Sequence, residues 1–219
     1  MKIDKEDMLL YAVTDRTWVG DRTLAEQVEE ALKGGATFVQ LREKKLDYEE
    51  FLKVAIEIKK HTDSYQVPFV INDNVAIALA CDADGVHVGQ EDMPVAIVRN
   101  MIGPNKILGV SVQTVAQAIQ AEQEGADYLG VGSVFPTKTK FDATPMSLQT
   151  VKEICNQVSI PVVAIGGIHE GNLLHLCGSD IDGVAVVSAV FAKANIQKAC
   201  EKLLELSREM VANHKGGVR

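Results

Sequence analysis

The sequence predicts an α/β fold, a single (β/α)8 TIM barrel, and three observations support this prediction. Short apolar runs typical of strands alternate with amphipathic stretches typical of helices along the 219 residues. Units of this kind recur roughly every 20 to 30 residues and number about eight, as in this barrel. The strand-like runs are apolar almost throughout, which is typical of a parallel sheet covered by helices. A doubly wound open sheet is the alternative.

The expected strands are short and rich in Val, Ile and Leu. Turns of the Gly-Ala-Asp type precede several of them, because glycine ends a helix and lets the chain turn into the next strand. In chain order, we expect strands at 9–15, 38–43, 68–73, 85–89, 106–112, 128–132, 161–167 and 183–188.

Between the strands, apolar residues recur at helical spacing. In the first such stretch, Leu24, Val28 and Leu32 lie on one stripe. Pro94 suits a first helical turn, and Thr114 is a capping residue at the start of another helix. In chain order, we expect helices at 23–33, 48–61, 93–101, 114–124, 147–158, 170–176 and 189–210.

No Gly-, Ser- or Pro-rich linker divides the chain. We therefore expect one domain over 1–219, with a structured core at about 8–210 and a frayed tail at 211–219. A net charge of −8 and a pI near 5.2 argue against a nucleic-acid surface. No apolar run approaches the length of about 18 residues that a membrane span needs.

The start of the chain is polar and mixed in charge, so no signal peptide is visible. The four cysteines are scattered and show neither a disulfide pattern nor zinc-ligand spacing. We therefore expect a cytoplasmic protein with reduced thiols. A homo-oligomer is compatible with the sequence, which does not fix the oligomeric state.

Polar residues stand where several expected strands end, and in a barrel these ends form the active-site rim. Gln40, Arg42 and Lys44 would share one strand face, because strand side chains alternate with period two. Two cations and an amide on one face favour anion binding, since fixed donors match phosphate oxygens. The alternative is a solvated strand in which Glu43 forms an ion pair.

Asp73 and Asp92 belong to the same expected rim as these cations. Bare carboxylates would repel a bound diphosphate, and a divalent cation would remove this conflict. The two acids therefore suggest Mg2+. The alternatives are a helix N-cap for Asp73 and a place in a first helical turn for Asp92.

The stretch 133–145 is long for a βα loop and rich in hydroxyls and lysines. It could bind phosphate and close over the site, or it could be a solvated loop. Gly167, Val187 and Ser188 fall at the ends of the last two strands, where barrels frequently bind phosphate. His87, in the middle of a strand, is interpreted as a satisfied core histidine.

Taken in order, these motifs resemble the thiamine-phosphate synthase (thiamine-phosphate pyrophosphorylase) family over about residues 11–189. The motifs are Tyr-Ala-Val-Thr-Asp at 11–15, Gln-Leu-Arg-Glu-Lys at 40–44, Ile-Asn-Asp at 71–73, Asp-Gly-Val-His-Val-Gly-Gln at 84–90 with Asp92, Gly-Val-Ser at 109–111, Gly-Ser-Val-Phe-Pro-Thr-Lys-Thr-Lys at 132–140, Ala-Ile-Gly-Gly-Ile at 164–168 and Val-Ser-Ala at 187–189.

The resemblance implies a Mg2+-dependent transferase that joins 4-amino-2-methyl-5-(diphosphooxymethyl)pyrimidine to 4-methyl-5-(2-phosphooxyethyl)thiazole, or to its carboxylated form. The products would be thiamine phosphate and diphosphate, formed by dissociative loss of diphosphate. It implies Asp73 and Asp92 as Mg2+ ligands. It implies that the pyrimidine diphosphate is held by Gln40, Arg42, Lys44, Asn72, Ser111 and Lys140, and that Leu41 and Glu43 complete the substrate-binding motif. It implies that the thiazole phosphate site is lined by Thr137, Lys138 through its backbone, Thr139, Gly167, Val187 and Ser188.

Within these sets, the groups expected to act on the departing diphosphate, and hence to be catalytic, are Arg42, Lys44, Ser111 and Lys140. Three other functions remain open at this stage. A thiazole tautomerase on the same fold would carry a histidine near Ser133. A sugar-phosphate isomerase would use two rim carboxylates as acid and base. A non-catalytic regulator would bind phosphate ligands only.

Overall fold

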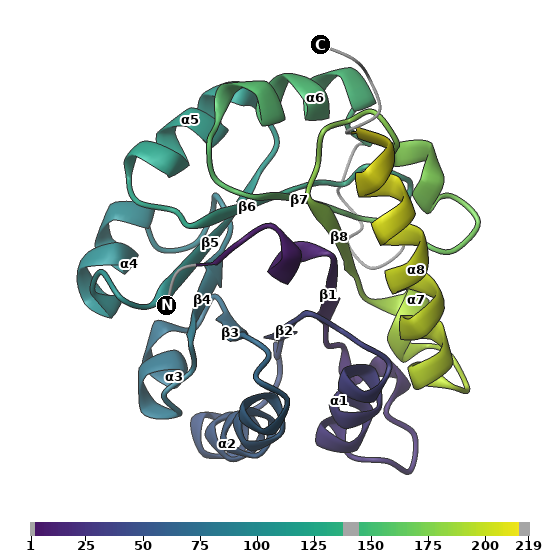
Figure 1. The fold of residues 1–219 in the computed structure, drawn as a ribbon. Coiled ribbons are helices and arrows are strands. Elements are labelled where there is room, and N and C mark those ends of the chain that lie inside the picture. Colours follow the sequence, from purple (N-terminus) through teal and green to yellow (C-terminus); the bar gives the residue numbers. More distant parts are fainter. Residues whose placement is uncertain (1–2, 138–144, 215–219) are drawn as a thin grey trace.

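The computed structural model describes residues 3–137 and 145–214. Eight parallel strands form a closed barrel in the order β1 to β8, and the helices surround it (Figure 1). The strand β1, Leu10–Val13, pairs with β2 on one side and with β8 on the other, which closes the sheet. The predicted (β/α)8 TIM barrel is therefore confirmed, and the open sheet is excluded.

All eight expected strands are present, and several end earlier than predicted. The strand β2 ends at Leu41, so residues 42–44 belong to the following loop. The expected strand at 9–15 ends at Val13. After β1, the strands are β2 Phe38–Leu41, β3 Phe69–Asn72, β4 Gly85–Val88, β5 Ile107–Val112, β6 Tyr128–Gly132, β7 Val162–Ile165 and β8 Gly183–Val186.

Several helices begin at residues whose side chains cap them. Thr23 and Glu26 form a reciprocal capping box at the start of the first α-helix, and Ser147 caps another. The described residues also form three short 3-10 helices, η1 to η3. In chain order, the helices of both kinds are η1 Glu6–Met8, η2 Arg16–Trp18, α1 Leu24–Lys33, α2 Tyr48–Tyr65, α3 Val75–Ala80, α4 Val95–Ile102, α5 Val115–Gln123, α6 Leu148–Gln157, η3 Leu173–Leu176, α7 Ser188–Phe191 and α8 Ile196–His214.

Four helix predictions need correction. The helix α3 was not expected, because six residues are too few to show a clear helical period. The helix expected at 170–176 is only the 3-10 turn η3. The helix expected at 189–210 is divided into α7 and α8 by residues 192–195. The helix α8 continues to His214, into the tail expected to be frayed, whose last residues, 215–219, lie outside the described ones.

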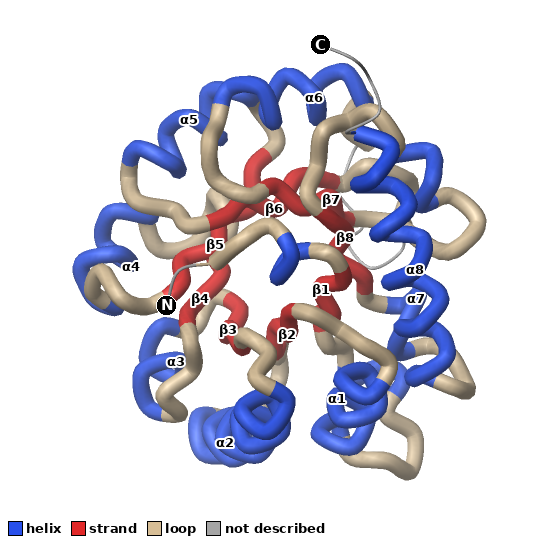
Figure 2. The backbone as a smooth tube through the Cα atoms, viewed as in Figure 1, coloured by secondary structure: helices blue, strands red, loops and turns tan. Residues whose placement is uncertain are grey.

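Two apolar clusters divide the interior. The larger one lies between the strands and the surrounding helices, which Figure 2 shows as a ring of strands inside a ring of helices. The smaller one lies inside the barrel and includes Met8, Tyr11, Phe38 and Tyr128. Successive residues of β2 alternate between them: Phe38 belongs to the inner cluster and Val39 to the outer one.

The 3-10 turn η1 covers the end of the barrel at which the strands begin (Figure 1). Its Met8 is 0% exposed and belongs to the inner cluster. The turn approaches β8 so closely that a Cβ on Gly183 would lie 1.8 Å from the Met8 carbonyl oxygen. Polar groups that bind a ligand must therefore gather at the opposite end.

No helix in the two described stretches is both long and apolar enough to cross a membrane. The cysteines Cys81, Cys155, Cys177 and Cys200 are all unbridged, as expected.

Replacing Met8 by Ala should lower the free energy of unfolding by about 2–5 kcal/mol, because truncation leaves a cavity under η1. Urea denaturation followed by circular dichroism measures this loss. Met101→Ala is the matched control, since Met101 on α4 is 48% exposed and its truncation should cost under about 1 kcal/mol. Equal losses in the two variants would show that η1 does not contribute to the inner core.

Candidate active site

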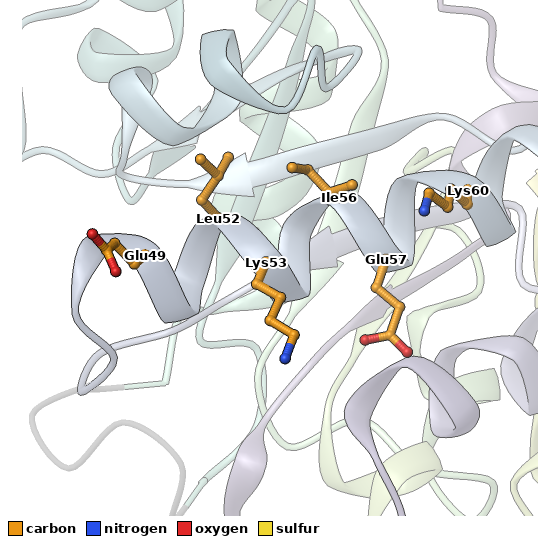
Figure 3. A pocket seen from close by; sticks show the side chains of 6 residues that line it. All are labelled: Glu49, Leu52, Lys53, Ile56, Glu57 and Lys60. Atoms are coloured by element: carbon orange, nitrogen blue, oxygen red, sulfur yellow. The ribbon is translucent and has the colours of Figure 1, made fainter.

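Of two hollows in the surface, only one borders the rim. A hollow of about 630 Å3 lies along one helix, α2, and its lining side chains extend from that single helix (Figure 3). Its charged groups, Glu49, Lys53, Glu57 and Lys60, alternate in sign and do not converge on a point. The second hollow, of about 200 Å3, includes Asp92 and so borders the rim. The candidate site is therefore the rim itself.

The strand β2 directs one predicted side chain into the barrel. Gln40 is 4% exposed, and its Nε2 donates to the Tyr11 hydroxyl oxygen at 2.5 Å. Leu41 points the other way, into the outer cluster, so only its backbone remains for a ligand. The predicted alternation applies to Gln40 alone, because β2 has ended before Arg42 and Lys44.

Arg42 and Glu43 are held by residues that follow β1. The Arg42 backbone N–H donates to Thr14 Oγ1 at 3.0 Å, and its guanidinium lies 3.8 Å from the Asp15 carboxylate. Glu43 forms an ion pair with Arg16 at 2.7 Å, and its side chain is only 3% exposed. Glu43 therefore takes the ion-pair role that the sequence left open, and Arg42 is the group of the two that can meet an anion.

Lys44, Asn72, Asp73 and Asp92 meet between the ends of β2, β3 and β4. Lys44 Nζ donates to Asp73 Oδ2 at 2.6 Å, and Asn72 Nδ2 donates to the same oxygen at 2.5 Å. The Gly89 N–H donates to Asp92 Oδ2 at 2.8 Å. The carboxyl groups of Asp73 and Asp92 are close enough for each to shift the pKa of the other.

The backbone at Asp73 is strained. Its φ is 61°, in the left-handed region that a non-glycine residue adopts at a cost of about 1–2 kcal/mol. Strain of this kind gathers at functional sites. The helix-capping role considered for Asp73 belongs instead to Asn74, whose Oδ1 accepts from the Ile77 N–H at 3.0 Å.

The pKa values of the two carboxyl groups are shifted in opposite directions. Burial and the neighbouring Asp92 raise the pKa of Asp73, although the Lys44 ammonium opposes this. Burial also raises the pKa of Asp92, but hydrogen bonds from the Asp73 carboxyl and the Gly89 N–H outweigh it and hold the pKa below its ordinary value. Two acids that compete for one proton are a suitable pair for a divalent cation, which removes their repulsion.

A metal at this position would have few protein ligands. Within residues 3–137 and 145–214, no group of three or more His, Cys, Asp or Glu side chains is arranged to hold an ion. Mg2+ typically uses one or two carboxylates and completes its shell with water and substrate phosphate. Asp73 and Asp92 fit that pattern.

A buried hydrogen-bonded set of side chains adjoins the rim, and the sequence did not predict it. The Tyr11 and Tyr128 hydroxyls lie 2.7 Å apart, and the Tyr128 hydroxyl is 2.8 Å from His87 Nδ1. His87 Nε2 is 2.8 Å from Ser111 Oγ. His87 is buried and hydrogen-bonded, as predicted for a core histidine. One of its two partners, however, is Ser111, a predicted site residue. The sequence feature that could have predicted this set is the presence of Tyr11, His87 and Tyr128 at strand positions that face into the barrel.

The loops after β6 and β7 are tied together. The Phe135 N–H donates to the Gly166 carbonyl at 3.1 Å, and a Cβ on Gly167 would lie 2.4 Å from the Pro136 carbonyl oxygen. Gly167 has φ 65°, so both its conformation and its contacts favour glycine. Thr137 is half-buried beside this contact.

The remaining predicted residues have two different outcomes. Val187 and Ser188 follow β8 at the same end of the barrel, where Ser188 is the first residue of α7. Lys138, Thr139 and Lys140 lie outside the described residues. The other predicted side chains, apart from Leu41 and Glu43, lie at or just below one rim.

The family model described as thiamine monophosphate synthase matches residues 10–190. The chain belongs to this family. The match covers the barrel from β1 to the start of α7 and includes every candidate site residue.

Individual members of the thiamine monophosphate synthase family are similar over nearly the whole chain. A thiamine-phosphate synthase of Clostridium tetani is 52% identical over 197 residues, which are 90% of this chain and 94% of that protein. One from Enterococcus faecalis is 46% identical over 211 residues, 96% of this chain and 100% of that protein. The solved thiamine phosphate pyrophosphorylase of Pyrococcus furiosus superposes with a TM-score of 0.87 and 41% identity, covering 94% of this chain and 98% of that one. The prediction that the chain is a transferase of this family is confirmed.

His87 should make the stability of the protein depend on pH. Burial lowers the pKa of His87 to about 4, from an ordinary value of 6.5, against the attraction of Asp92. Between these values the unfolded chain binds a proton that the folded chain does not, so stability should fall as the pH falls from 6.5 to 4. The loss should be about 3 kcal/mol.

Urea denaturation midpoints at pH 7 and pH 4.5 measure this loss. The His87→Gln variant should show a smaller difference between the two pH values. His175→Gln is the control, because His175 is exposed on η3 and its replacement should leave the difference unchanged. Parallel pH profiles for wild type and His87→Gln would contradict a neutral buried imidazole.

Proposed function

We propose that this chain is a thiamine-phosphate synthase that couples a pyrimidine diphosphate with a thiazole phosphate to give thiamine phosphate and diphosphate. The substrates are 4-amino-2-methyl-5-(diphosphooxymethyl)pyrimidine and 4-methyl-5-(2-phosphooxyethyl)thiazole, or its carboxylated form, which would also release CO2. The observation that carries the proposal is the cluster of Lys44, Asp73 and Asp92 at the rim of a barrel of this family. A cation beside two acids suits a diphosphate that arrives with a metal ion.

We assign diphosphate binding to groups that follow β2, end β3 and lie on β5. Arg42 and Lys44 supply positive charge, and Asn72 and Ser111 supply neutral donors. Lys44 forms an ion pair with Asp73 at 2.6 Å. This ion pair is half-exposed, so exchanging it for a phosphate contact costs little. Lys140 is proposed to add a further cation from the loop after β6.

Asp73 and Asp92 would hold Mg2+. When bound, the ion would neutralise charge on the diphosphate as it leaves. The structural support is the pair of carboxyl groups, which compete for a proton while no cation separates them.

The reaction needs no general base. The bond between the pyrimidine methylene carbon and the diphosphate oxygen breaks, and the electron pair leaves with the oxygen. The thiazole nitrogen then forms the new C–N bond with its own lone pair. The protein is therefore left to position two rings, stabilise the leaving anion and exclude water.

The second phosphate site is proposed between the ends of β6, β7 and β8. Gly167 brings its backbone close to the loop that carries Thr137, and Val187 and Ser188 follow β8. Lys138, through its backbone, and Thr139 complete the proposed set. The proposed thiazole-phosphate site lies across the rim from the Asp73–Asp92 pair.

The raised pKa of Asp73 also favours one rival, an isomerase that uses this carboxyl as a general acid. An isomerase would release no diphosphate. The histidine expected of a thiazole tautomerase is absent, because Ser133 stands there, buried and donating to the Phe135 carbonyl at 2.5 Å.

The decisive assay incubates the purified protein with both phosphorylated heterocycles and Mg2+ and measures released inorganic diphosphate. We expect release only when both substrates are present, and its loss when a chelator removes the metal. Turnover of the thiazole phosphate alone would favour the tautomerase. No release under any condition would overturn the proposal.

Replacing Asp73 by Asn should lower Mg2+-dependent turnover by about 100-fold or more, because one ligand charge at the leaving group is lost. The fold should survive, since burial and the neighbouring Asp92 raise the pKa of Asp73 and so disfavour its ionised form in the folded chain. Steady-state rates at several Mg2+ concentrations, with thermal melts, test this. Asp21→Asn, at an exposed position, is the control. Wild-type turnover in Asp73→Asn would remove Asp73 from the metal site.

Replacing Arg42 by Ala should weaken binding of the pyrimidine diphosphate by about tenfold or more and leave binding of the thiazole phosphate unchanged. Calorimetric titration with each ligand measures the two affinities separately. Arg208→Ala on the exposed face of α8 controls for the general loss of positive charge. Equal weakening for both ligands would show that the two sites are misassigned.

A further inference from the structure

Five side chains inside the barrel form one continuous hydrogen-bond chain. Gln40 Nε2 reaches the Tyr11 hydroxyl at 2.5 Å, which lies 2.7 Å from the Tyr128 hydroxyl. Tyr128 then reaches His87 Nδ1 at 2.8 Å, and His87 Nε2 reaches Ser111 Oγ at 2.8 Å. The chain thus begins and ends at residues proposed to contact substrate and crosses the barrel between them.

The members come from five different strands, so the barrel fold itself holds them in register. They lie on β1, β2, β4, β5 and β6. The Phe38 ring packs against Tyr11 and Tyr128, with centroids 4.5 and 5.4 Å away. A Cβ on Gly109 would lie 2.3 Å from the Tyr128 hydroxyl and 2.5 Å from His87 Nδ1. The bond between these groups therefore occupies the space that a side chain on β5 would fill.

The donors can be assigned from the amide end. Gln40 Nε2 has only hydrogens to offer, so the Tyr11 oxygen accepts. The Tyr11 hydrogen must then point to Tyr128, and the Tyr128 hydrogen to His87 Nδ1. Nδ1 accepts, so a neutral imidazole carries its proton on Nε2 and donates it to Ser111 Oγ. The hydrogen of Ser111 is left to point into the site.

The opposite assignment leaves a buried donor unsatisfied. If His87 donated from Nδ1, Tyr128 would donate to Tyr11, whose oxygen would then receive two hydrogens. The described residues offer the Tyr11 hydroxyl hydrogen no further acceptor. A buried donor without an acceptor is disfavoured. A doubly protonated imidazole is disfavoured as well, because burial lowers the pKa of His87 to about 4.

We propose that Tyr11, Tyr128 and His87 are positioning residues that fix Ser111 as a hydrogen-bond donor toward the departing diphosphate. The proposal rests on the proposed function for its ligand, but the direction of the chain does not depend on it. An unsupported serine hydroxyl rotates freely and can present a lone pair to the anion. Nε2–H of His87 occupies one of the two lone pairs and cannot accept the hydroxyl hydrogen, so that hydrogen is left for the anion.

The chain also couples its two ends. All four bonds share one direction, so a ligand that turned the Gln40 amide to present its oxygen to Tyr11 would reverse each bond in turn. Ser111 would then donate to His87 and present only lone pairs to the site. The orientation of Gln40 therefore selects whether Ser111 is a donor or an acceptor.

The first test reads the tautomer of His87 in the unliganded wild-type protein at pH 7. Nitrogen-15 NMR of labelled histidine distinguishes the two ring nitrogens, and His87→Gln assigns the signal. We expect the proton on Nε2. A proton on Nδ1 would overturn the proposal whether or not the protein is a synthase.

The second test removes one link without touching the site. Tyr128→Phe deletes the donor to Nδ1, so the His87 signal should change to a mixture of tautomers. The rate constant kcat should fall roughly tenfold, with KM for the thiazole phosphate unchanged. Tyr48→Phe on the exposed face of α2 should alter neither quantity. A Tyr128→Phe variant with wild-type kcat would overturn the proposal.

A third test separates positioning from folding and from the proposed function. His87→Gln keeps an amide donor near the Nε2 position and should retain more diphosphate affinity than His87→Leu, which has none. Calorimetry with inorganic diphosphate and Mg2+ measures this without turnover, and thermal melts confirm that both variants fold. Equal affinity in the two folded variants would overturn the role of His87. Failure of turnover in the wild type, with the expected tautomer and affinities, would instead reject only the proposed function.

Discussion

The pairing of β1 with both β2 and β8 is the constraint on which the rest of the structure depends. Its residues Tyr11 and Ala12 face Phe38 and Val39 on one side and Ala185 and Val186 on the other. Closure removes both sheet edges and brings all eight carboxyl ends to one rim. Tyr11 on β1 and Tyr128 on β6 are far apart in the order of strands, and closure lets their hydroxyls meet across the barrel at 2.7 Å.

The barrel uses its two ends for different purposes. At the end where strands begin, Met8 of η1 packs into the apolar inner cluster. At the other end, a positive cluster meets two carboxyl groups, and the Asp73 backbone is strained. Such an arrangement is poor for stability but suited to binding, because ligand charge can satisfy groups that the protein alone leaves in competition. The rim residues can therefore be selected for ligand binding, since the apolar end of the barrel provides the stability.

The fold could be predicted from the sequence because it depends on the period of the apolar residues and on the spacing of the strand-like runs. Strand-like runs at near-constant intervals predicted all eight strands, while α3 was missed since six residues show no clear period. The end of β2 was placed too late, since a charged loop that continues the alternation looks the same as a strand. Motif order was sufficient for the family, and Lys44, Asp73 and Asp92 meet as expected.

Side-chain partners could not be read from the sequence in the same way. Glu43 belongs to a motif expected to bind substrate, yet it pairs with Arg16, a contact that depends on how two loops meet. Tyr11, Tyr128 and His87 stand alone in three strands, and their common hydrogen-bond chain depends on the barrel's register. The role of Asn74 as the helix cap was equally invisible among three adjacent candidates.

The lack of a side chain at Gly109 limits which substitutions this chain can accept. The Tyr128 ring from β6 occupies the volume above it, so two neighbouring strands share one slot in the layer of inward side chains. Enlarging position 109 alone would collide with the ring, and shrinking position 128 alone would open a void. Substitutions at the two sites should therefore be strongly non-additive, and a library that redesigns the barrel lumen must vary them as a pair.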